Sequence, residues 1–328
     1  MAIHIVDSVA LPDAAYNFDP TYGRSLDDLL AIEPPEPPDG FDAFWRETFD
    51  INARSPLDYE LKHVEYPDPA WTVYRADFKS WGDFRTGAWI THRTGGRINR
   101  GVVVGHGYGG REMPGGADVP VDDAAYIFPV ARGFHISASS SLPKNNSSEH
   151  VVFGIETRET YLIRACVAEQ WTAASVLLDA FPSIGSNLYY IGGSFGGGIG
   201  ALMLPWDLRF IKAALAVPTF GHHPIRLTCP CVGSGESVRK YFQTHPEVID
   251  VLKFYDAATA ATRIKIPMAL TAARFDPAVP PPGQFAVCNA VPCPKELFVV
   301  SMGHRDYPES AASAAQINAY LRNEFFVD

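Results

Sequence analysis

Residues 188–198 read Leu-Tyr-Tyr-Ile-Gly-Gly-Ser-Phe-Gly-Gly-Gly. An apolar run typical of a buried strand leads directly into the pattern Gly192-Gly193-Ser194-Phe195-Gly196, and small residues that predict the start of a helix follow. A serine at so sharp a turn takes a strained backbone conformation, and glycines on both sides let strand and helix approach each other. The stretch predicts that Ser194 is a nucleophile exposed at the carboxyl edge of a sheet, with the positive end of a helix behind it.

A glycine-rich turn also serves to pack a helix on a strand or to cradle a phosphate. The Walker pattern and the dinucleotide-binding pattern each require a glycine spacing that residues 192–198 lack. We therefore favour the nucleophile interpretation.

The chain around this turn predicts an α/β fold with a mostly parallel central sheet flanked by helices. After Arg100, apolar runs that read as strands alternate with segments that read as helices, which is typical of parallel strands buried on both faces. A long helix is expected over residues 156–181. The strand candidates are residues 101–104, 134–138, 188–191, 213–217, 268–271 and 297–300.

We expect residues 1–328 to form one α/β-hydrolase domain. Residues 1–57 are an N-terminal extension, in which Ser25 is a possible N-cap of one helix, and apolar residues at helical spacing from Phe41 to Phe49 predict another. Short runs over residues 59–94 predict antiparallel strands. Residues 222–262 interrupt the strand order with helical and loop material, and we place them near the site.

Composition excludes several classes of function. The 328 residues are 47% hydrophobic and carry a net charge of −10, which is the wrong sign for binding nucleic acid. No signal peptide or membrane-spanning run is evident, so we expect a soluble, cytoplasmic protein. The cysteine count of five is odd and favours a reducing compartment. The Cys229-Pro-Cys231 pair alone is weak evidence for zinc, and no metal is expected.

A serine nucleophile needs a base and an acid to orient that base. In an α/β-hydrolase these follow the serine in the order acid, then histidine, on loops after later strands. Asp276 follows the apolar run that ends at Phe275, and His304 follows the run that ends at Met302, so we predict that Asp276 and His304 complete the triad. The rival bases are His106, His222, His223 and His245, and the rival acids are Asp256 and Asp306.

The oxyanion of the tetrahedral intermediate needs two backbone N–H donors. The first is expected from Phe195, directly after the nucleophile. The second is expected from the glycine-rich loop after residues 101–104, where Tyr108 is the first choice and Gly107 or Gly109 are alternatives.

These residues resemble a known family, the acetyl xylan esterases and cephalosporin C deacetylases of carbohydrate esterase family seven. The resemblance extends over nearly the whole chain and rests on several segments. They are PPEPPDGFDAFW near the start, GYGGR from residue 107, GGSFGGGIGAL from residue 192, AVPTFGH, FYDAATAATRIKIPMAL, DPAVPPPGQFAVCNAV from residue 276, and the glycine before His304.

The resemblance implies an α/β-hydrolase fold and assigns Ser194, Asp276 and His304 as the triad. It likewise assigns the amides of Tyr108 and Phe195 to the oxyanion hole. It also implies that the reaction needs no cofactor and that the substrate is a small acetyl ester or an acetylated oligosaccharide. Two further residues, Pro218 and Phe220, are expected to form walls of the substrate pocket. The alternative is that they only pack in the core.

Some positions depart from the family pattern. The family's Arg-Gly-Gln-Gly motif is replaced by Arg132-Gly133-Phe134-His135, a glutamine often found after the nucleophile is replaced by Phe195, and a glutamate after the catalytic histidine is replaced by Arg305. Residues 139–156 are shorter than the family's insertion, which helps to build a hexamer. We therefore expect a homo-oligomer without assigning its size.

The hypothesis is a serine esterase that removes acetyl or short acyl groups through an acyl-enzyme. One alternative is a hydrolase of the same fold that acts on another bond or a longer acyl chain, as a peptidase or a lipase-like esterase does. Another is a non-catalytic binding protein of this fold, which would have no need to keep Ser194, Asp276 and His304 in their roles.

Overall fold

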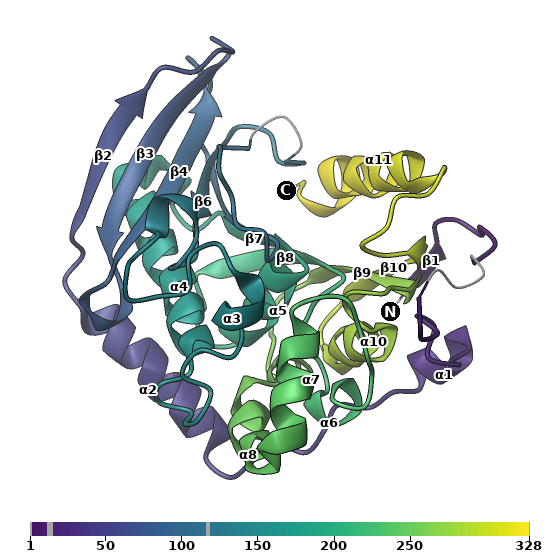
Figure 1. Ribbon diagram of the computed structural model, residues 1–328. Helices are drawn as coiled ribbons and strands as arrows, with labels where there is room; N and C mark the ends of the chain where they lie inside the picture. The colour runs from purple at the N-terminus through teal and green to yellow at the C-terminus, as the bar shows by residue number, and fades with distance from the viewer. Residues whose placement is uncertain (1, 12–15, 116–118, 328) are drawn as a thin grey trace.

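A computed structural model describes residues 2–11, 16–115 and 119–327, and it is built around a single ten-stranded sheet (Figure 1). The strand order is β1-β10-β9-β8-β7-β5-β6-β4-β3-β2. The first seven strands in this order, which run from β1 to β6, pair in parallel. At the other end of the sheet, β4, β3 and β2 are added to β6 by antiparallel pairing. The strands are β1 (Ala2–Ile5), β2 (Tyr59–Val64), β3 (Trp71–Lys79), β4 (Arg85–Arg93), β5 (Arg100–Gly105), β6 (Ala124–Pro129), β7 (Leu188–Gly193), β8 (Phe210–Ala216), β9 (Met268–Phe275) and β10 (Lys295–Met302).

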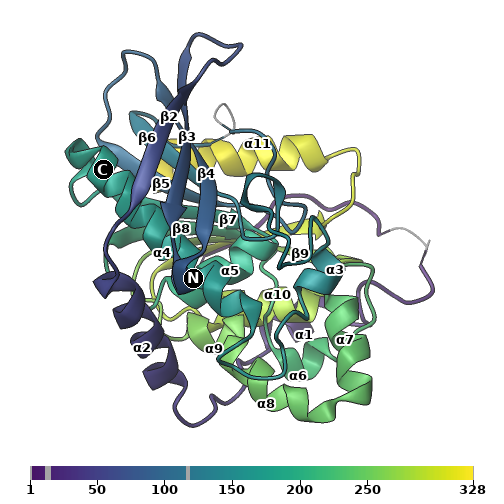
Figure 2. The same ribbon diagram turned by 60° about the vertical axis from the view of Figure 1, so that its left-hand side comes forward.

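Helices cover both faces of the sheet. The long helix α4 and the helices α5 and α10 pack on one face, while α11 lies over the other (Figures 1 and 2). A cavity of about 340 Å³ is lined by residues of α11 and of the central strands. The α-helices are α1 (Leu26–Leu30), α2 (Phe41–Arg54), α3 (Ser147–His150), α4 (Leu162–Ala180), α5 (Phe195–Met203), α6 (His223–Arg226), α7 (Gly235–Thr244), α8 (Ile249–Leu252), α9 (Ala257–Ala261), α10 (Pro281–Ala290) and α11 (Ser310–Tyr320).

Shorter helical turns connect these elements. The 3-10 turns are η1 (Trp81–Asp83), η2 (His135–Ser137), η3 (Pro182–Ile184), η4 (Pro246–Val248) and η5 (Lys253–Tyr255), and η6 (Leu321–Phe325) is a π-helical turn after α11. No helix in the described parts of the chain has both the length and the apolar character of a membrane span.

The N-terminal helices are fixed by their ends and by buried aromatic rings. Ser25 caps α1 as the sequence predicts, and it forms a capping box with Asp28. In α2 the apolar stripe buries Phe41, Phe44 and Trp45. The indole N–H of Trp45 donates a 2.7 Å hydrogen bond to the carbonyl of Phe254. This stripe holds α2 on the body of the domain, because large buried rings dominate packing energies.

One predicted strand is wrong. Residues 134–138 do not join the sheet; β6 lies earlier, at Ala124–Pro129, and residues 135–137 form the turn η2. Positive φ angles at Gly133 (89°) and His135 (39°) break the extended path. Ser137 is buried, and its hydroxyl donates to the carbonyl of Val130. The predicted helix over residues 156–181 begins later, at Leu162, and β1 has no counterpart among the predictions.

Candidate active site

Ser194 stands at the turn between β7 and α5, with φ 55° and ψ −112°. Its amide donates a 2.8 Å hydrogen bond to the carbonyl of Ala216 on β8. A Cβ on Gly192 would lie 2.5 Å from the carbonyl oxygen of Gly196, and one on Gly196 would lie 2.6 Å from the carbonyl carbon of Gly105. Both glycines are therefore sterically required, as the pattern predicts.

The structure brings Ser194, His304 and Asp276 together at the carboxyl edge of the sheet. His304 Nε2 lies 2.8 Å from Ser194 Oγ, and His304 Nδ1 lies 2.7 Å from Asp276 Oδ2. Since a carboxylate only accepts, Nδ1 carries the proton and Nε2 is left to accept from the serine hydroxyl. Asp276 is fully buried, whereas the His304 side chain is 25% exposed. The serine is therefore paired with an oriented base at a site open to solvent.

The topology explains this convergence. Ser194 follows β7, Asp276 follows β9, and His304 follows β10, three strands that run parallel in one sheet. Carboxyl ends of parallel strands lie at the same edge, which is where ligands bind in open α/β sheets. Gly303 permits the final approach, because a Cβ there would lie 2.3 Å from Asp276 Oδ2.

The Asp276 carboxylate is held by donors on both oxygens. Oδ1 accepts from the amides of Ala278 and Val279, each at 2.9 Å. Oδ2 accepts from Gln284 Nε2 at 2.8 Å in addition to His304. These contacts fix the plane of the carboxylate.

The electrostatics favour protonation of His304. Burial alone would lower the pKa of His304, but the hydrogen bond to Asp276 and the charge of that carboxylate outweigh it, so that the pKa lies above the usual 6.5. An imidazolium formed at this position is therefore stabilised by its neighbour.

Tyr108 and Phe195, the two predicted oxyanion residues, also meet. Tyr108 lies in a turn closed by a 3.0 Å bond from the amide of Gly110 to the carbonyl of Gly107. Phe195 is the first residue of α5, where an amide has no acceptor within the helix. The two rings pack with centroids 4.2 Å apart, so that the loop after β5 is held against the start of α5.

A buried chain of polar groups supports Tyr108. Its hydroxyl lies 3.0 Å from Nδ1 of His150, whose Nε2 lies 2.9 Å from the carbonyl of Arg132. Burial lowers the pKa of His150 to about 4. Arg132 in turn forms a buried ion pair of 2.6 Å with Glu169. The sequence predicts neither His150 nor Glu169, because both act over contacts that no local pattern encodes.

Residues 132–135, which replace the family's Arg-Gly-Gln-Gly motif, are held in place by contacts of Arg132 and Phe134. Arg132 is fixed by Glu169 and by a 2.8 Å bond to the carbonyl of Trp81. Phe134 is 1% exposed, and its ring packs 4.9 Å from that of His150 and 6.0 Å from that of Tyr108. The motif therefore forms part of the wall behind Tyr108.

Pro218 and Phe220, the two predicted pocket walls, are both buried. The ring of Phe220 packs edge-on against Phe195 at 6.0 Å. Between β8 and Pro218, the half-exposed Val217 has a φ of 41°. A β-branched residue rarely adopts a positive φ, and backbone strain of this kind is found most often at active sites and binding sites. No sequence signal predicts it.

The rival side chains have structural roles. Both ring nitrogens of His106 are engaged, with the carbonyl of Gly107 and the amide of Ala131, and burial lowers its pKa to about 4. Burial lowers the pKa of His223 to about 3. Asp256 caps α9 and accepts from four backbone amides.

The remaining rivals lie on loops and surface helices. His222 precedes α6, and its ring accepts from the amide of Ile225. The ring of His245 stacks on that of Tyr241. Asp306 is an exposed residue after His304.

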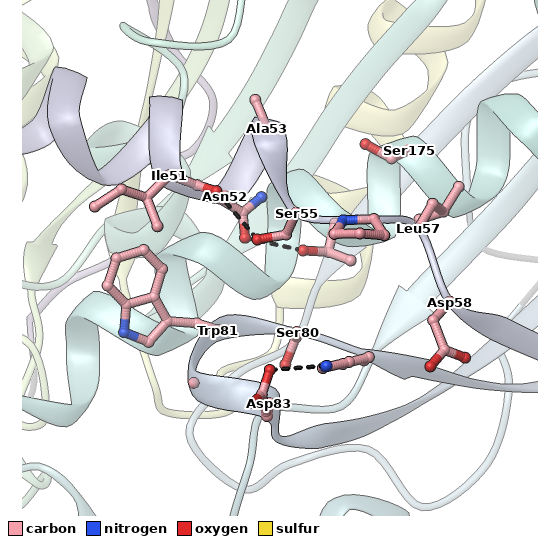
Figure 3. A pocket seen from close by; sticks show the side chains of 14 residues that line it. Ile51, Asn52, Ala53, Ser55, Leu57, Asp58, Ser80, Trp81, Asp83 and Ser175 are labelled. Carbon is pink, nitrogen blue, oxygen red and sulfur yellow. Dashed lines mark hydrogen bonds and ion pairs between the residues drawn. The ribbon is translucent and has the colours of Figure 1, made fainter.

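A separate cavity of about 530 Å³ lies between α2, η1 and α4 (Figure 3). Asn52, Asp58 and Trp81 line it, as do Lys79 and Asp83, which form an ion pair of 2.9 Å. Its lining contains no serine paired with a histidine, so it offers no chemistry comparable to that at Ser194. Among the residues that the structure describes, no cluster of His, Cys, Asp and Glu is suited to a metal ion, and the five cysteines are free thiols.

The fold resembles those of solved esterases. An acetyl xylan esterase from Paenibacillus sp. R4 is 21% identical, with a TM-score of 0.79 over 91% of this chain and 100% of that one. Acetyl Xylan Esterase 1 from Thermoanaerobacterium sp. JW/SL YS485 is 18% identical, with a TM-score of 0.77 over 93% and 99%. A cold-adapted esterase from an Arctic intertidal metagenomic library is 14% identical, with a TM-score of 0.54 over 81% and 98%.

These likenesses establish an α/β-hydrolase fold. The sequence itself matches the acetyl xylan esterase family over residues 24–323. Because that match spans most of the 328 residues, the chain belongs to the acetyl xylan esterase family and is a carboxylic ester hydrolase.

Proposed function

We propose that this esterase removes acetyl or similarly short acyl groups from small esters or acetylated saccharides, through a Ser-His-Asp triad and an acyl-enzyme. The observation that carries the proposal is the pair of hydrogen bonds that link Asp276 Oδ2 to His304 and His304 to Ser194 Oγ, of 2.7 and 2.8 Å.

In the first half-reaction, Ser194 Oγ attacks the ester carbonyl carbon while its proton passes to His304 Nε2. Asp276 stabilises the imidazolium that results. The carbonyl oxygen becomes an oxyanion, for which the amides of Tyr108 and Phe195 are the proposed donors. The C–O bond to the alcohol then breaks, the alcohol takes the proton from Nε2, and Ser194 is left acylated.

In the second half-reaction, water attacks the acyl carbon while His304 Nε2 takes its proton. The tetrahedral intermediate collapses, the bond to Ser194 Oγ breaks, and the serine recovers its proton from His304. The carboxylic acid leaves and the starting state returns. No cofactor enters either half-reaction.

A small acyl group suits the aromatic layer beside the nucleophile. Phe195 and Phe220 are 3% and 1% exposed, and with Tyr108 they fill the volume around the start of α5. Pro218 and Phe220 are the proposed walls on the acyl side. The homo-oligomer and the cytoplasmic location stay predictions.

The test uses Ser194→Ala. Hydrolysis of p-nitrophenyl acetate should fall by at least about 10³-fold while the thermal unfolding curve is unchanged. A fluorophosphonate probe should label the wild type and spare the variant. Turnover at the wild-type rate by Ser194→Ala would refute the proposal.

A series of p-nitrophenyl esters of increasing chain length then defines the acyl group. A steep fall beyond propionate supports a deacetylase, whereas a rise toward longer chains supports the lipase-like alternative. Acetylated xylo-oligosaccharides and cephalosporin C, compared at equal concentration, would identify the preferred alcohol.

A further inference from the structure

Gln284 is a fully buried amide on α10, and it lies beside the acid of the triad. Its Oε1 accepts from the amide of Ala273 at 2.9 Å. Its Nε2 donates to the carbonyl of Val279 at 2.7 Å and to Asp276 Oδ2 at 2.8 Å. An N–H can only donate and a carbonyl can only accept, so the contacts with Ala273 and Val279 fix which end of the amide faces Asp276.

The proline run explains how Gln284 reaches this position. Prolines occupy the first turn of α10, where their missing amides cost nothing and their fixed φ favours the helix. A close backbone approach between Gly283 and Gly221 holds the helix against the loop after β8, since a Cβ on Gly221 would lie 2.1 Å from the carbonyl oxygen of Gly283. Gln284 is therefore presented to Asp276 by a rigid element.

Oδ2 of Asp276 is shared between Gln284 Nε2 and His304 Nδ1. The other carboxylate oxygen is anchored by the amides of Ala278 and Val279. With Gln284 in place, the carboxylate can neither tilt about its anchored oxygen nor direct all of the charge on Oδ2 toward the imidazole.

We propose that Gln284 is a positioning residue for the triad. It orients the Asp276 carboxylate toward His304 Nδ1, and by donating to the same oxygen it weakens the pull of that carboxylate on the imidazolium. The side-chain hydrogen bonds of Gln284 go to Ala273, Val279 and Asp276, so Gln284 acts on the triad through Asp276. This inference rests on the proposed function, because it assigns a partner to the proposed acid.

The test compares Gln284→Met with Gln170→Met. Methionine matches glutamine in length and lacks the donor, and Gln170 is a second buried glutamine, 4% exposed, on α4. Fluorophosphonate titration counts competent sites, so that kcat is expressed per folded enzyme.

Gln284→Met should lower plateau kcat by about 10- to 100-fold, as loss of a supporting hydrogen bond does at other sites. KM should change less than twofold, and the acid limb of the pH profile should move to higher pH. Gln170→Met should leave all three unchanged.

A double-mutant cycle separates positioning from mere stability. In an Asp276→Asn background, Gln284→Met should have no further effect on kcat, because the group through which it acts is already altered. An equal loss in both backgrounds would overturn the proposal, and so would an acid limb that stays at its wild-type position. If the Met variant does not accumulate, Gln284→Asn withdraws the amide by one methylene and should show the same signature more mildly.

The same series distinguishes this inference from the proposed function. Wild-type turnover by Asp276→Asn would refute the triad itself. A large loss in Asp276→Asn together with wild-type behaviour in Gln284→Met would refute only the role of Gln284.

Discussion

Tyr108 donates a 3.0 Å hydrogen bond from its hydroxyl to Nδ1 of His150, although 42 residues separate the two in sequence. The direction of this bond follows from the other ring nitrogen. Nε2 faces the carbonyl of Arg132, so it carries the proton and leaves Nδ1 as the acceptor. The loop that carries a proposed oxyanion donor is thereby tied to the buried interior by its side chain.

Tyr108→Phe should lower kcat/KM for p-nitrophenyl acetate by about three- to tenfold. The backbone amide survives, but a hydrogen bond worth about 0.5–1.5 kcal/mol no longer holds the loop. Tyr59→Phe is the matched control, because it removes a hydroxyl bonded to Asp179 on the distant edge of the sheet. Equal kcat/KM in Tyr108→Phe and Tyr59→Phe would show that the contact with His150 is irrelevant to catalysis.

In the proposed mechanism, the raised pKa of His304 sets the acid limb of the rate profile. Only the neutral imidazole accepts the serine proton, so kcat/KM should rise with pH through an apparent pKa above 6.5. The same pKa shift affects stability, but with the opposite dependence on pH. The folded state binds the His304 proton more tightly than the unfolded chain does. The contribution of His304 to the free energy of unfolding is therefore full below pH 6.5 and is lost as the pH rises through the pKa of the folded state. An acid limb at or below 6.5 would contradict this assignment.

Three buried histidines predict loss of stability in acid. Burial lowers the pKa of His106 and His150 to about 4 and that of His223 to about 3. Below pH 6.5 the unfolded chain therefore binds protons that the folded chain does not. Each histidine should reduce the free energy of unfolding by about 1.4 kcal/mol per pH unit between 6.5 and 4.

Urea unfolding at a series of pH values checks this slope. His150→Phe removes one contributor, so its stability should depend less steeply on pH than that of the wild type. A slope unchanged by His150→Phe would count against a neutral, buried His150.

The Arg132–Glu169 pair should be costly to break from either side. Its side chains are 9% and 0% exposed, and Glu169 also accepts from the hydroxyl of Thr86. Glu169→Gln or Arg132→Met alone leaves a buried charge without its partner, with an expected loss of about 3–5 kcal/mol in the free energy of unfolding. The double variant should recover part of this loss in urea denaturation. Strictly additive losses would mean that the two charges do not stabilise each other.

Gly196→Ala should disrupt the turn that presents Ser194. The new Cβ would lie 2.6 Å from backbone atoms of Gly105, which belong to a central strand and cannot give way. We expect a loss of about 1–3 kcal/mol or more in unfolding free energy together with loss of fluorophosphonate labelling. Gly109→Ala, whose Cβ would meet nothing within 4 Å, is the control for stability alone. Equal stability of the two variants would contradict the packing argument.

Local patterns predict the elements that end at the site. Each strand before Ser194, Asp276 and His304 contains a short run of mostly apolar residues, and the predicted bounds lie within a few residues of the observed ones. This works because a parallel strand buried on both faces leaves an uninterrupted apolar signal. The prediction of a strand at 134–138 is wrong. The residues Phe134-His135-Ile136 have a strand-like composition, but the positive φ angles of Gly133 and His135 turn the chain there.

The supporting residues could not be predicted in the same way. Gln284 and His150 reach Asp276 and Tyr108 only after helices and loops have packed, and no spacing rule connects them. Nor does a four-residue run such as Ala2–Ile5 carry enough periodicity to be read as a strand. Its place in the sheet depends on a partner far away in the sequence.

That strand, β1, has a consequence for the order of assembly. It pairs with β10, and just beyond it Asp7 accepts from the amide of Ser301, 294 residues later, and from the hydroxyl of Tyr307. During synthesis on a ribosome, β1 emerges long before the strand that it must pair with, and contacts of such high sequence separation form slowly. We therefore expect β10 and the segment that carries His304 to join the sheet after the turn at Ser194 has formed, so a nascent chain with that turn already folded lacks the proposed base until β10 has emerged.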